Sequence, residues 1–382
     1  MQTVCLENKC AGCMACLEIC PKHAITIQKD ITKMNAAIDE SLCTNCGLCH
    51  KVCQSNNPAE FRYPESWWQG WAKDPEIRNA SSSGGIATAI EHMFVSSGGI
   101  VCSCAFENGE FGFRFASCVE EVKLFSGSKY VKSNPVGIYK RIKELLSEGN
   151  RVLFVGLPCQ VSAVHNFVGK RLSENLYTID LICHGSPLPE VLEMFLKQYD
   201  LSLDDLDQIG FRTKTAFQVN DKRKYFSTKG TKDSYTISFL NAISYTENCY
   251  TCKYATTERV SDITLGDSWG SELEETMQNK GISLILCQTE KGKELIQNSN
   301  LQLIDVNLER AKAYNHQLVA PAKQPSERLA FFNDLKKGEP FDKVVSKYYK
   351  KQYIKQKIKG MLLKLKLVRG GTISYSVYIH DL

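Results

Sequence analysis

Two copies of one cysteine pattern constrain this chain more than any other feature of its sequence. Both copies have the spacing C-x2-C-x2-C-x3-C, and they consist of Cys10, Cys13, Cys16 and Cys20 and of Cys43, Cys46, Cys49 and Cys53. This spacing lets three thiolates of a tight loop bind one cubane cluster while the fourth points away to a second cluster. The pattern therefore predicts two 4Fe-4S clusters, one held by Cys10, Cys13, Cys16 and Cys53 and the other by Cys43, Cys46, Cys49 and Cys20.

Zinc is the alternative, because it also binds cysteine pairs at this spacing. A third cysteine at x2 followed by one at x3 fits a cube better than a tetrahedral ion. The compartment supports ligation, since we find no basic region followed by an apolar leader and no apolar run near the roughly 18 to 20 residues of a spanning helix. We expect a cytoplasmic protein, in which the 17 cysteines bind metal or clusters rather than pair as disulfides.

The first 57 residues resemble bacterial two-cluster ferredoxins, and we expect their short strands at residues 25–27 and 36–38. One departure is that Gln54 stands where the first motif has Pro21, which alters local rigidity and not the number of ligands. Cys5 lies outside the pattern and is expected to be an ordinary thiol. The polar segment 54–60 is expected to be a linker.

Residues 58–340 have the alternating pattern of a mixed α/β domain. The expected strands are 99–102, 151–156, 177–182 and 283–286, and the expected helices are 86–94, 136–146, 187–199 and 290–296. Residues 207–245 are expected to form an antiparallel insertion. The predicted fold class is thus a ferredoxin-like domain followed by an α+β or α/β domain.

Four further cysteines stand in places that suggest a second redox centre. Cys159 and Cys183 each follow an expected strand, and Cys249 and Cys252 close the insertion. Loops that follow parallel strands gather at one edge of a sheet, so these residues can converge. From spacing alone, these four cysteines either hold a third 4Fe-4S cluster or consist of buried core cysteines and a cysteine pair that binds zinc. Cys102, Cys104, Cys118 and Cys287 are expected in the core.

Several short segments, taken together and in order, make the chain similar to the coenzyme F420 hydrogenase/dehydrogenase beta-subunit family from Cys10 to about Gly292. They are 81–85 (SSSGG), 128–131 (SKYV), 156–160 (GLPCQ), 180–185 (DLICHG), the Cys249–Cys252 pair, 261–270 (SDITLGDSWG), 281–284 (GISL) and 289–292 (TEKG). The resemblance implies FAD beside a third cluster held by Cys159, Cys183, Cys249 and Cys252. It does not fix one substrate.

A flavin site has weaker independent support in the segment before the helix at 86–94. Its hydroxyls and glycine amides, together with the positive end of the helix, are suited to a diphosphate, although a plain helix cap explains them too. The residues expected to bind the cofactor are Arg78, Ser81, Ser82, Ser83, Gly84, Gly85, Lys129, Tyr130, Asp267 and Trp269. The nucleotide-binding motifs GxGxxG and Walker A are absent, so ferredoxin or a deazaflavin is favoured over NAD(P)H as electron donor.

His184 follows a candidate cluster ligand, where a proton donor beside a reduced flavin would be useful. A structural histidine explains it equally well. The same balance applies to Asp267 and Trp269, which either line a flavin or shape a turn. Of these residues only His184 is proposed as catalytic.

The basic residues are concentrated in the expected C-terminal region, 341–382. Ten Lys or Arg and no Asp or Glu lie between Lys343 and Arg369, so the remainder of the chain carries a net charge of −5. This distribution gives no argument for nucleic acid binding. We expect one basic amphipathic helix from Phe341 to about Val368 that packs by its apolar stripe on its own domain, with an anionic membrane or an acidic partner as the alternatives.

The functional hypothesis is an iron–sulfur flavoprotein oxidoreductase that moves electrons between clusters and FAD, with hydride exchange to a deazaflavin or another small organic substrate. Ferredoxin or another redox protein is the expected partner. The first alternative is a non-catalytic relay subunit that connects a partner enzyme, and the second is a cluster-based sensor.

Overall fold

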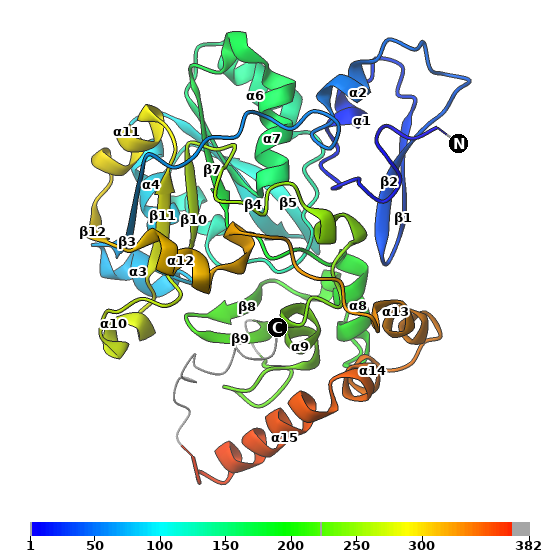
Figure 1. Cartoon of the computed structure of the whole chain (residues 1–382), viewed down its shortest axis with the longest axis vertical. Coiled ribbons are helices and arrows are strands. Elements are labelled where there is room, and N and C mark those ends of the chain that lie inside the picture. The colour runs from blue at the N-terminus through cyan, green and yellow to red at the C-terminus, as the bar shows by residue number, and fades with distance from the viewer. Residues whose placement is uncertain (1, 222–223, 369–382) are drawn as a thin grey trace.

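The computed structural model describes residues 2–221 and 224–368 (Figure 1). An N-terminal ferredoxin-like region lies beside a larger domain built on one mixed sheet, and a C-terminal helical segment lies at the far end of the long axis. Among the residues described, no helix combines the length and the apolar character needed to pass through a bilayer.

The ferredoxin-like region consists of two short helices and one hairpin. Its elements are α1 (Ala15–Ile19), β1 (Ile25–Asp30), β2 (Lys33–Ile38) and α2 (Leu48–Val52). The hairpin is antiparallel and pairs Ile25 with Ile38. Each helix follows a loop that carries the first cysteines of a motif, and the fourth cysteine stands directly after the helix, so each turn of helix separates the third thiol from the fourth. Both expected strands are confirmed.

The larger domain is built on an eight-stranded sheet with a parallel centre. In spatial order its strands are β12 (Leu301–Asp305), β3 (Ser66–Ala72), β11 (Ser283–Cys287), β10 (Ile263–Asp267), β7 (Leu176–Leu181), β6 (Val152–Gly156), β4 (Ile100–Glu107) and β5 (Glu110–Ala116). The parallel neighbours are β4, β6, β7 and β10, and the flanking pairs are antiparallel. The central strands are buried on both faces, as strands covered on both sides should be, although β7 and β10 also bury the polar residues Thr178, Asp180 and Thr264.

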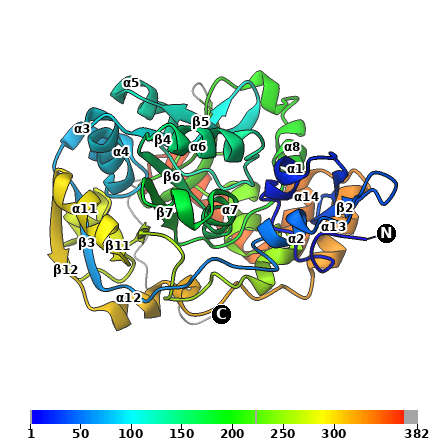
Figure 2. The same ribbon diagram turned by 90° about the horizontal axis from the view of Figure 1, so that it is seen from above.

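Helices cover both faces of this sheet (Figure 2). One face packs against α4 (Ile86–Ser96), α5 (Val119–Val122) and α11 (Glu290–Asn298), and the other against α6 (Ile138–Ser147), α7 (Pro158–Val168) and α12 (Leu308–Tyr314). Shorter helices fill the connections: α3 (Pro75–Ala80), α10 (Glu275–Asn279), and the 3-10 turns η1 (Lys123–Phe125), η2 (Lys170–Leu172), η3 (Leu203–Asp205), η4 (Glu247–Thr251) and η5 (His316–Leu318). The expected strands and helices of the α/β core are all present.

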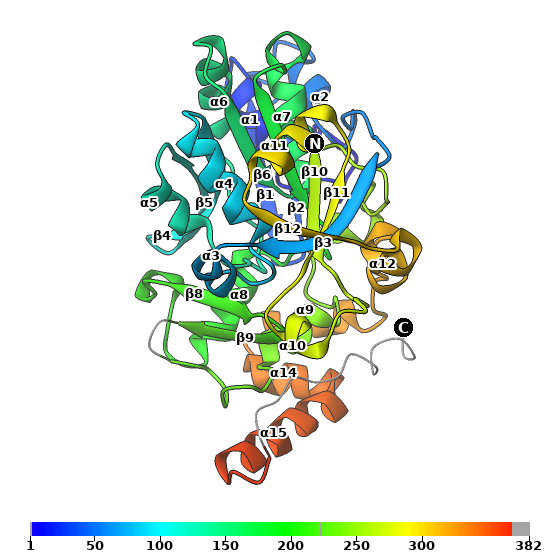
Figure 3. The same cartoon turned by 90° about the vertical axis from the view of Figure 1, so that its left-hand side faces the viewer.

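A second lobe lies below the sheet and contains the predicted antiparallel insertion (Figure 3). It contains β8 (Ile209–Thr213), β9 (Ala216–Asp221), α9 (Ser234–Leu240), α8 (Pro189–Lys197), α13 (Arg328–Lys336), α14 (Phe341–Tyr348) and α15 (Lys350–Lys364). Among its described residues, β8 and β9 form the one strand pair of the insertion, which is thus a hairpin followed by a helix. Aromatic side chains from these elements form its core.

The expected single C-terminal helix is instead two helices, because Tyr349 adopts a non-helical backbone between α14 and α15. The apolar side chains of α14, such as Val344 and Val345, are buried, whereas those of α15, such as Ile358 and Met361, are exposed. Packing by the apolar stripe is thus correct for α14 and wrong for α15. The last residues of the predicted tail, 369–382, lie outside the described residues.

The ferredoxin-like region is fastened to the larger domain through its cluster loops. The Glu18 carboxylate accepts hydrogen bonds from the backbone amides of Gly137 (2.6 Å) and Lys140 (3.1 Å), which satisfies free donors at the start of α6. Tyr139 of the same helix donates from its hydroxyl to the carbonyl of Cys13. The first motif is therefore tied to the helix layer of the main sheet.

Candidate electron-transfer site

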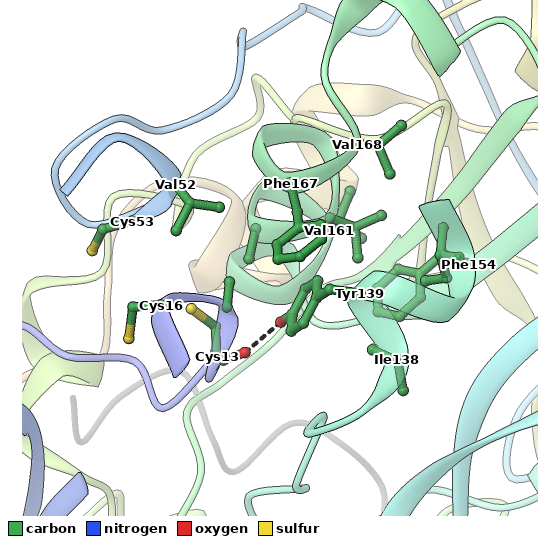
Figure 4. Close-up of a cluster of buried hydrophobic side chains, with 14 of the residues drawn as sticks. Cys13, Cys16, Val52, Cys53, Ile138, Tyr139, Phe154, Val161, Phe167 and Val168 are labelled. Atoms are coloured by element: carbon green, nitrogen blue, oxygen red, sulfur yellow. Dashed lines mark hydrogen bonds between the residues drawn. The ribbon is translucent and has the colours of Figure 1, made fainter. Parts of the chain in front are cut away.

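The first set of thiols is formed by Cys10, Cys13, Cys16 and Cys53, all of them buried. Figure 4 shows the sulfurs of Cys13, Cys16 and Cys53 beside α6 and α7. Burial and the nearby thiols of Cys16 and Cys10 raise the pKa of Cys13, and Cys53 adds to this effect. The four thiols are close enough to interact electrostatically, as ligands of one cluster must be.

The second set consists of Cys20, Cys43, Cys46 and Cys49, and all four line one cavity of about 100 Å³. Cys20 comes from the first motif and joins three thiols of the second motif. Burial raises the pKa of Cys49, and the thiols of Cys20 and Cys43 add to this effect. Cys46 is exposed, so this set lies nearest to solvent.

The third set consists of Cys159, Cys183, Cys249 and Cys252, which line another cavity of about 210 Å³. Burial raises the pKa of Cys183, and the thiols of Cys249, Cys159 and Cys252 raise it further. The chain separations between these residues are large, yet all four thiols face the same space.

The sheet explains how two of these thiols meet. Gly156 at the end of β6 pairs with Asp180 near the end of β7, and both strands are parallel. Their next residues therefore emerge at one edge, where Cys159 enters the first turn of α7 and Cys183 begins a loop. Gly185 then turns the loop at a φ of 132°, where the ring of Tyr245 would collide with any Cβ.

Arg259 joins the segment that carries Cys183 to the segment that carries Cys249 and Cys252. Its guanidinium pairs with Asp180 at 3.1 Å and donates to the carbonyls of Leu181 and Tyr254. Arg259 is 1% exposed and Asp180 is fully buried. Because Leu181 precedes Cys183 by two residues and Tyr254 follows Cys252 by two, this one side chain fixes both segments.

The first and third sets adjoin each other. The Cys13 thiol, besides those of the third set, contributes to the raised pKa of Cys159, for which burial is the main cause. Gln54, which replaces the proline expected after the second motif, accepts a 2.7 Å hydrogen bond from Tyr254. The residue that departs from the ferredoxin pattern therefore connects the two sets, and the expected linker segment is buried where it begins.

Lys132 lies between these two sets, and nothing in its sequence context distinguishes it from its neighbours. It is buried, it lines the cavity of the third set, and its Nζ donates at 2.9 Å to the carbonyl of Ala11. Its charge lowers the pKa of both Cys10 and Cys159, although burial raises that of Cys159 overall. Among the described residues, no carboxylate lies within ion-pair distance of its ammonium group.

His184 connects the third set to a charged and aromatic cluster. It lines the same cavity with an exposed side chain, and desolvation by the surrounding protein lowers its pKa, with opposing contributions from Asp267 and Arg212. The imidazole is therefore neutral at physiological pH. Arg212 donates to Asp267 at 2.7 Å, and its guanidinium carbon lies 5.2 Å from the Trp269 ring centre. Arg212 was not selected from the sequence, where it lies in a polar insertion without a motif.

Two of the three serines expected to bind a phosphate use their hydroxyl hydrogens within the chain. Ser81 donates to the carbonyl of Ile77 at 2.7 Å, and Ser83 donates to that of Ile282 at 2.9 Å. Lys214, from the β8–β9 turn, donates to the carbonyls of Ser81 and Ser83. These contacts close the segment against the insertion.

The remaining residues of this segment are arranged differently. Ser82 accepts a bond from the backbone amide of Ser128 at 2.9 Å, so its own hydroxyl hydrogen is not used in that contact. The amide of Gly84 donates to Ser283. Gly85 precedes α4 at a φ of 83°, a conformation that favours glycine.

The two cations expected beside a phosphate are both held by the chain itself. Arg78 is buried, donates to the carbonyl of Gly281 at 2.8 Å and lies over the ring of Trp71. Lys129 donates to the carbonyls of Phe125 and Ser126. Tyr130 stacks on aromatic rings of the lobe.

The remaining cysteines differ in their surroundings. Cys102 and Cys287 are fully buried and Cys104 is partly buried, as expected for core residues. Cys118 is exposed, because β5 ends at Ala116 and Cys118 lies before α5, so its assignment to the core is wrong. Cys5 is buried, and hydrogen bonds with Cys10 and Cys53 raise its pKa.

Across residues 2–221 and 224–368, no group of three or more His, Cys, Asp or Glu side chains is arranged to hold a single metal ion. A four-iron cluster separates its thiolates more widely than one tetrahedral ion does. A cavity lined by all four cysteines is therefore the geometry expected of a cluster site, and the second and third sets each line such a cavity.

Comparisons with known families divide the chain as its cysteines do. A family model described as a 4Fe-4S dicluster domain matches residues 9–57. Two models describe the coenzyme F420 hydrogenase/dehydrogenase beta subunit, and the one for its N-terminal part matches residues 67–137 while the one for its C-terminal part matches residues 149–307. Together these two models cover most of the chain beyond the ferredoxin-like region.

Curated relatives are distant in sequence. One of the subunits of an F(420)H(2) dehydrogenase from Methanosarcina mazei is 24% identical over 69% of this chain and 78% of that protein. A coenzyme F420-dependent sulfite reductase from Methanocaldococcus jannaschii is 23% identical over 84% of this chain, which spans only 50% of that protein. A chain of a xenon-derivatised F420-reducing [NiFe] hydrogenase complex from Methanosarcina barkeri is similar at a TM-score of 0.47, with 19% identity over 67% of this chain and 90% of that chain.

Proposed function

Because the chain belongs to the coenzyme F420 hydrogenase/dehydrogenase beta-subunit family and carries a ferredoxin-like iron–sulfur region, we propose that it is the electron-transferring subunit of an F420-linked oxidoreductase. Electrons pass singly along three 4Fe-4S clusters, two in residues 1–57 and one in residues 58–340. The third cluster is held by Cys159, Cys183, Cys249 and Cys252.

The order of the three thiol sets is the observation that carries this proposal. The second set is open to solvent at Cys46, the first is buried, and the third adjoins the first through Cys13 and Cys159. A row of neighbouring cluster sites is what a conduit for single electrons requires. The row begins at the protein surface and ends beside His184.

The position of Lys132 supports anionic clusters on both sides of it. A buried ammonium group without a counter-charge is strongly destabilising, and among the described residues its ammonium has no carboxylate within 4 Å. Four thiolates give each cluster a net negative charge, so two clusters would supply the missing counter-charges. This support is independent of the spacing of the cysteines.

FAD and hydride exchange with a deazaflavin form the finer part of the proposal, and family membership supports them. A flavin would accept a hydride and return its electrons one at a time. Ser82 and the Arg212–Asp267 pair beside Trp269 would face it. Arg78 and Lys129 donate to backbone carbonyls of the chain itself, which leaves them fewer donors for a phosphate, so no step is assigned to the flavin.

The bonding of these two cations favours the relay subunit as the second candidate function. In that case the same clusters would deliver electrons to a partner protein that holds the flavin and the organic substrate. The basis of the proposal, single-electron transfer along the clusters, is common to both functions. They differ only in where the pair of electrons is used.

Anaerobic purification with iron, sulfide and flavin analysis tests both functions. Three clusters predict about twelve iron atoms per chain, with one FAD for the enzyme and none for the relay. An optical titration with reduced ferredoxin, a reduced deazaflavin and NADPH then identifies the donor. About eight iron atoms per chain would refute the third cluster, and a chain that binds FAD but whose clusters the deazaflavin does not reduce would refute F420 linkage.

A further inference from the structure

Helix α15 packs against the lobe through a mixed side, on which Tyr353 contacts the aromatic core and two glutamines make hydrogen bonds. Gln352 exchanges two hydrogen bonds with Asn241, at 2.8 and 2.9 Å, and Gln356 accepts a 2.9 Å bond from the backbone amide of Lys232. Gly360 is the one buried residue of the helix. A Cβ there would lie 3.0 Å from Thr228, so this glycine lets the helix approach closely.

The opposite side of α15 carries an exposed apolar stripe. Its members are Ile354 (44% exposed), Ile358 (53%), Met361 (63%) and Leu365 (64%). They recur at intervals of three and four residues, so they form one continuous line along the helix. At a rise of about 1.5 Å per residue the line is roughly 16 Å long. The helix therefore carries apolar side chains on an exposed side as well as on the side that faces its own domain.

Lysines border the stripe on both edges. At about 100° per residue, Lys351 and Lys355 fall beside one edge and Lys357 and Lys364 beside the other. All four are exposed, and only Lys357 has a carboxylate nearby, that of Asp342 at 3.8 Å, within the described part of the chain. The face therefore combines exposed apolar side chains with unneutralised positive charge.

We propose that this face of α15 binds the surface of an anionic lipid bilayer. Apolar side chains of such a helix enter the acyl boundary, while lysines extend their long stems to the phosphate groups at either side. An acidic protein would satisfy the lysines and leave the stripe in water, and a second copy of the helix would bring like charges together. The bilayer satisfies both features at once.

The position of α15 fits this role. Figures 1 and 3 show the helix at the end of the molecule away from the ferredoxin-like region, below β8, β9 and α9. Binding through α15 would hold the chain at a membrane surface and leave the exposed Cys46 of the second thiol set free for a redox partner. The proposal does not depend on the identity of the substrate.

Co-sedimentation of the full chain with vesicles tests the proposal. We expect binding to phosphatidylcholine vesicles that contain one third phosphatidylglycerol, and little binding to phosphatidylcholine alone. Replacing Lys351→Gln and Lys355→Gln together should weaken binding about 25-fold at low salt, because each lysine near an anionic surface contributes about fivefold. The variant Ile358→Asp/Met361→Asp should weaken binding by more than about tenfold at every salt concentration.

Matched controls lie elsewhere on the surface. Leu329→Asp changes an apolar side chain of α13 that is 72% exposed, and Lys140→Gln/Lys170→Gln removes two exposed lysines near α6 and α7. Both control variants should bind as the original chain does. Circular dichroism and iron content verify that every variant is folded.

Three results would overturn the proposal. The first is equal binding by the stripe variant and the original chain. The second is a dimer in size-exclusion chromatography that Ile358→Asp/Met361→Asp converts to a monomer, which would assign the stripe to a second copy. The third is binding to vesicles by a chain that ends at Val368 but not by the full chain. In that case residues 369–382, and not a bilayer, would be the occupant of the stripe.

Discussion

Replacing Lys132 by methionine is the perturbation that tests the proposed clusters most directly. The side chain keeps a similar length and apolar stem but loses its charge. In the structure the ammonium group donates to the carbonyl of Ala11, between Cys10 and Cys13, and it also lines the cavity of Cys159. Reduction adds one negative charge to a cluster, so a nearby positive charge favours the reduced state. Lys132→Met should therefore lower the midpoint potentials of the first and third clusters.

The size of the shift follows from Coulomb's law. The ammonium group is hydrogen-bonded to the carbonyl of Ala11, one residue from Cys10 and two from Cys13. Two Cα spacings, on the order of 7 Å, therefore approximate the distance from the ammonium group to a cluster. One unit charge at that distance and an effective dielectric constant of about 20 interacts by about 2 kcal/mol. For a one-electron couple this corresponds to about 90 mV. Water that enters the site would reduce the shift, so about 50 mV is a reasonable lower value for the measurement.

Anaerobic redox titration followed by electron paramagnetic resonance measures the potentials of all clusters in one sample. The second cluster, held around Cys46, should keep its potential and serves as an internal reference. Lys129→Met is the matched control, because Lys129 is another lysine held in place by backbone carbonyls, those of Phe125 and Ser126. It should leave every cluster potential within about 20 mV, since no cluster thiol is among the groups that act on it. Lys132→Arg retains the charge and should restore most of the potential.

Two outcomes would refute the reasoning. If Lys132→Met binds the full complement of iron and no potential moves, the ammonium group does not lie between clusters. If the potential of the second cluster falls as much as the others, the shift reflects a general change in the protein. Loss of iron in Lys132→Met but not in Lys132→Arg would instead indicate that the charge is needed to hold the clusters, which supports the same arrangement.

Three further predictions concern other residues. Cys249→Ser should lower the iron content from about twelve to about eight atoms per chain and leave the ferredoxin-like pair intact; unchanged iron would reject Cys249 as a ligand. Arg259→Met should lower the free energy of unfolding by about 3 to 5 kcal/mol, because it leaves the Asp180 carboxylate buried and unpaired, and a guanidinium titration that finds less than about 1 kcal/mol would contradict this. Burial raises the pKa of Glu91 from 4.5 to about 7, so its contribution to stability is complete below pH 4.5 and is lost as the pH rises through 7, by about 3 kcal/mol. Glu91→Gln should flatten the stability profile over that range, and an unchanged pH slope in unfolding titrations would count against the buried acid.

The ferredoxin-like region was predictable because its ligands are encoded by local spacing. The exchange of Cys20 and Cys53 between motifs follows from where each short helix ends, and it brings Cys20 into the second cavity. The α/β core was equally predictable from alternating strands and helices. The meeting of Cys159 with Cys183 follows in turn from two parallel neighbouring strands.

Other features depend on contacts between distant segments and have no local signal. Lys129 and Lys132 are similar in sequence context, but the side chain of Lys132 points toward the thiols and that of Lys129 toward Phe125 and Ser126. Gln54 was expected only to change rigidity, yet it binds Tyr254 across the two domains. The orientation of α15 was expected to be the reverse of what is observed, because a periodic pattern locates an apolar stripe without saying whether it faces the protein. A glycine at 360 and two glutamines decide that choice.

In the proposed function, the arrangement separates the place where single electrons are exchanged from the place where they are used in pairs. The second thiol set has an exposed cysteine, so a redox protein can approach it without any rearrangement. The third set lies behind the first, beside His184, whose side chain is exposed, and near the Arg212–Asp267 pair. The two ends of the proposed row are therefore chemically different, because a guanidinium–carboxylate pair acts on His184 at this end, whereas no Arg, Asp or Glu among the described residues lines the cavity of the second set. A partner that supplies single electrons is therefore expected at Cys46, and a carrier of electron pairs at the other end.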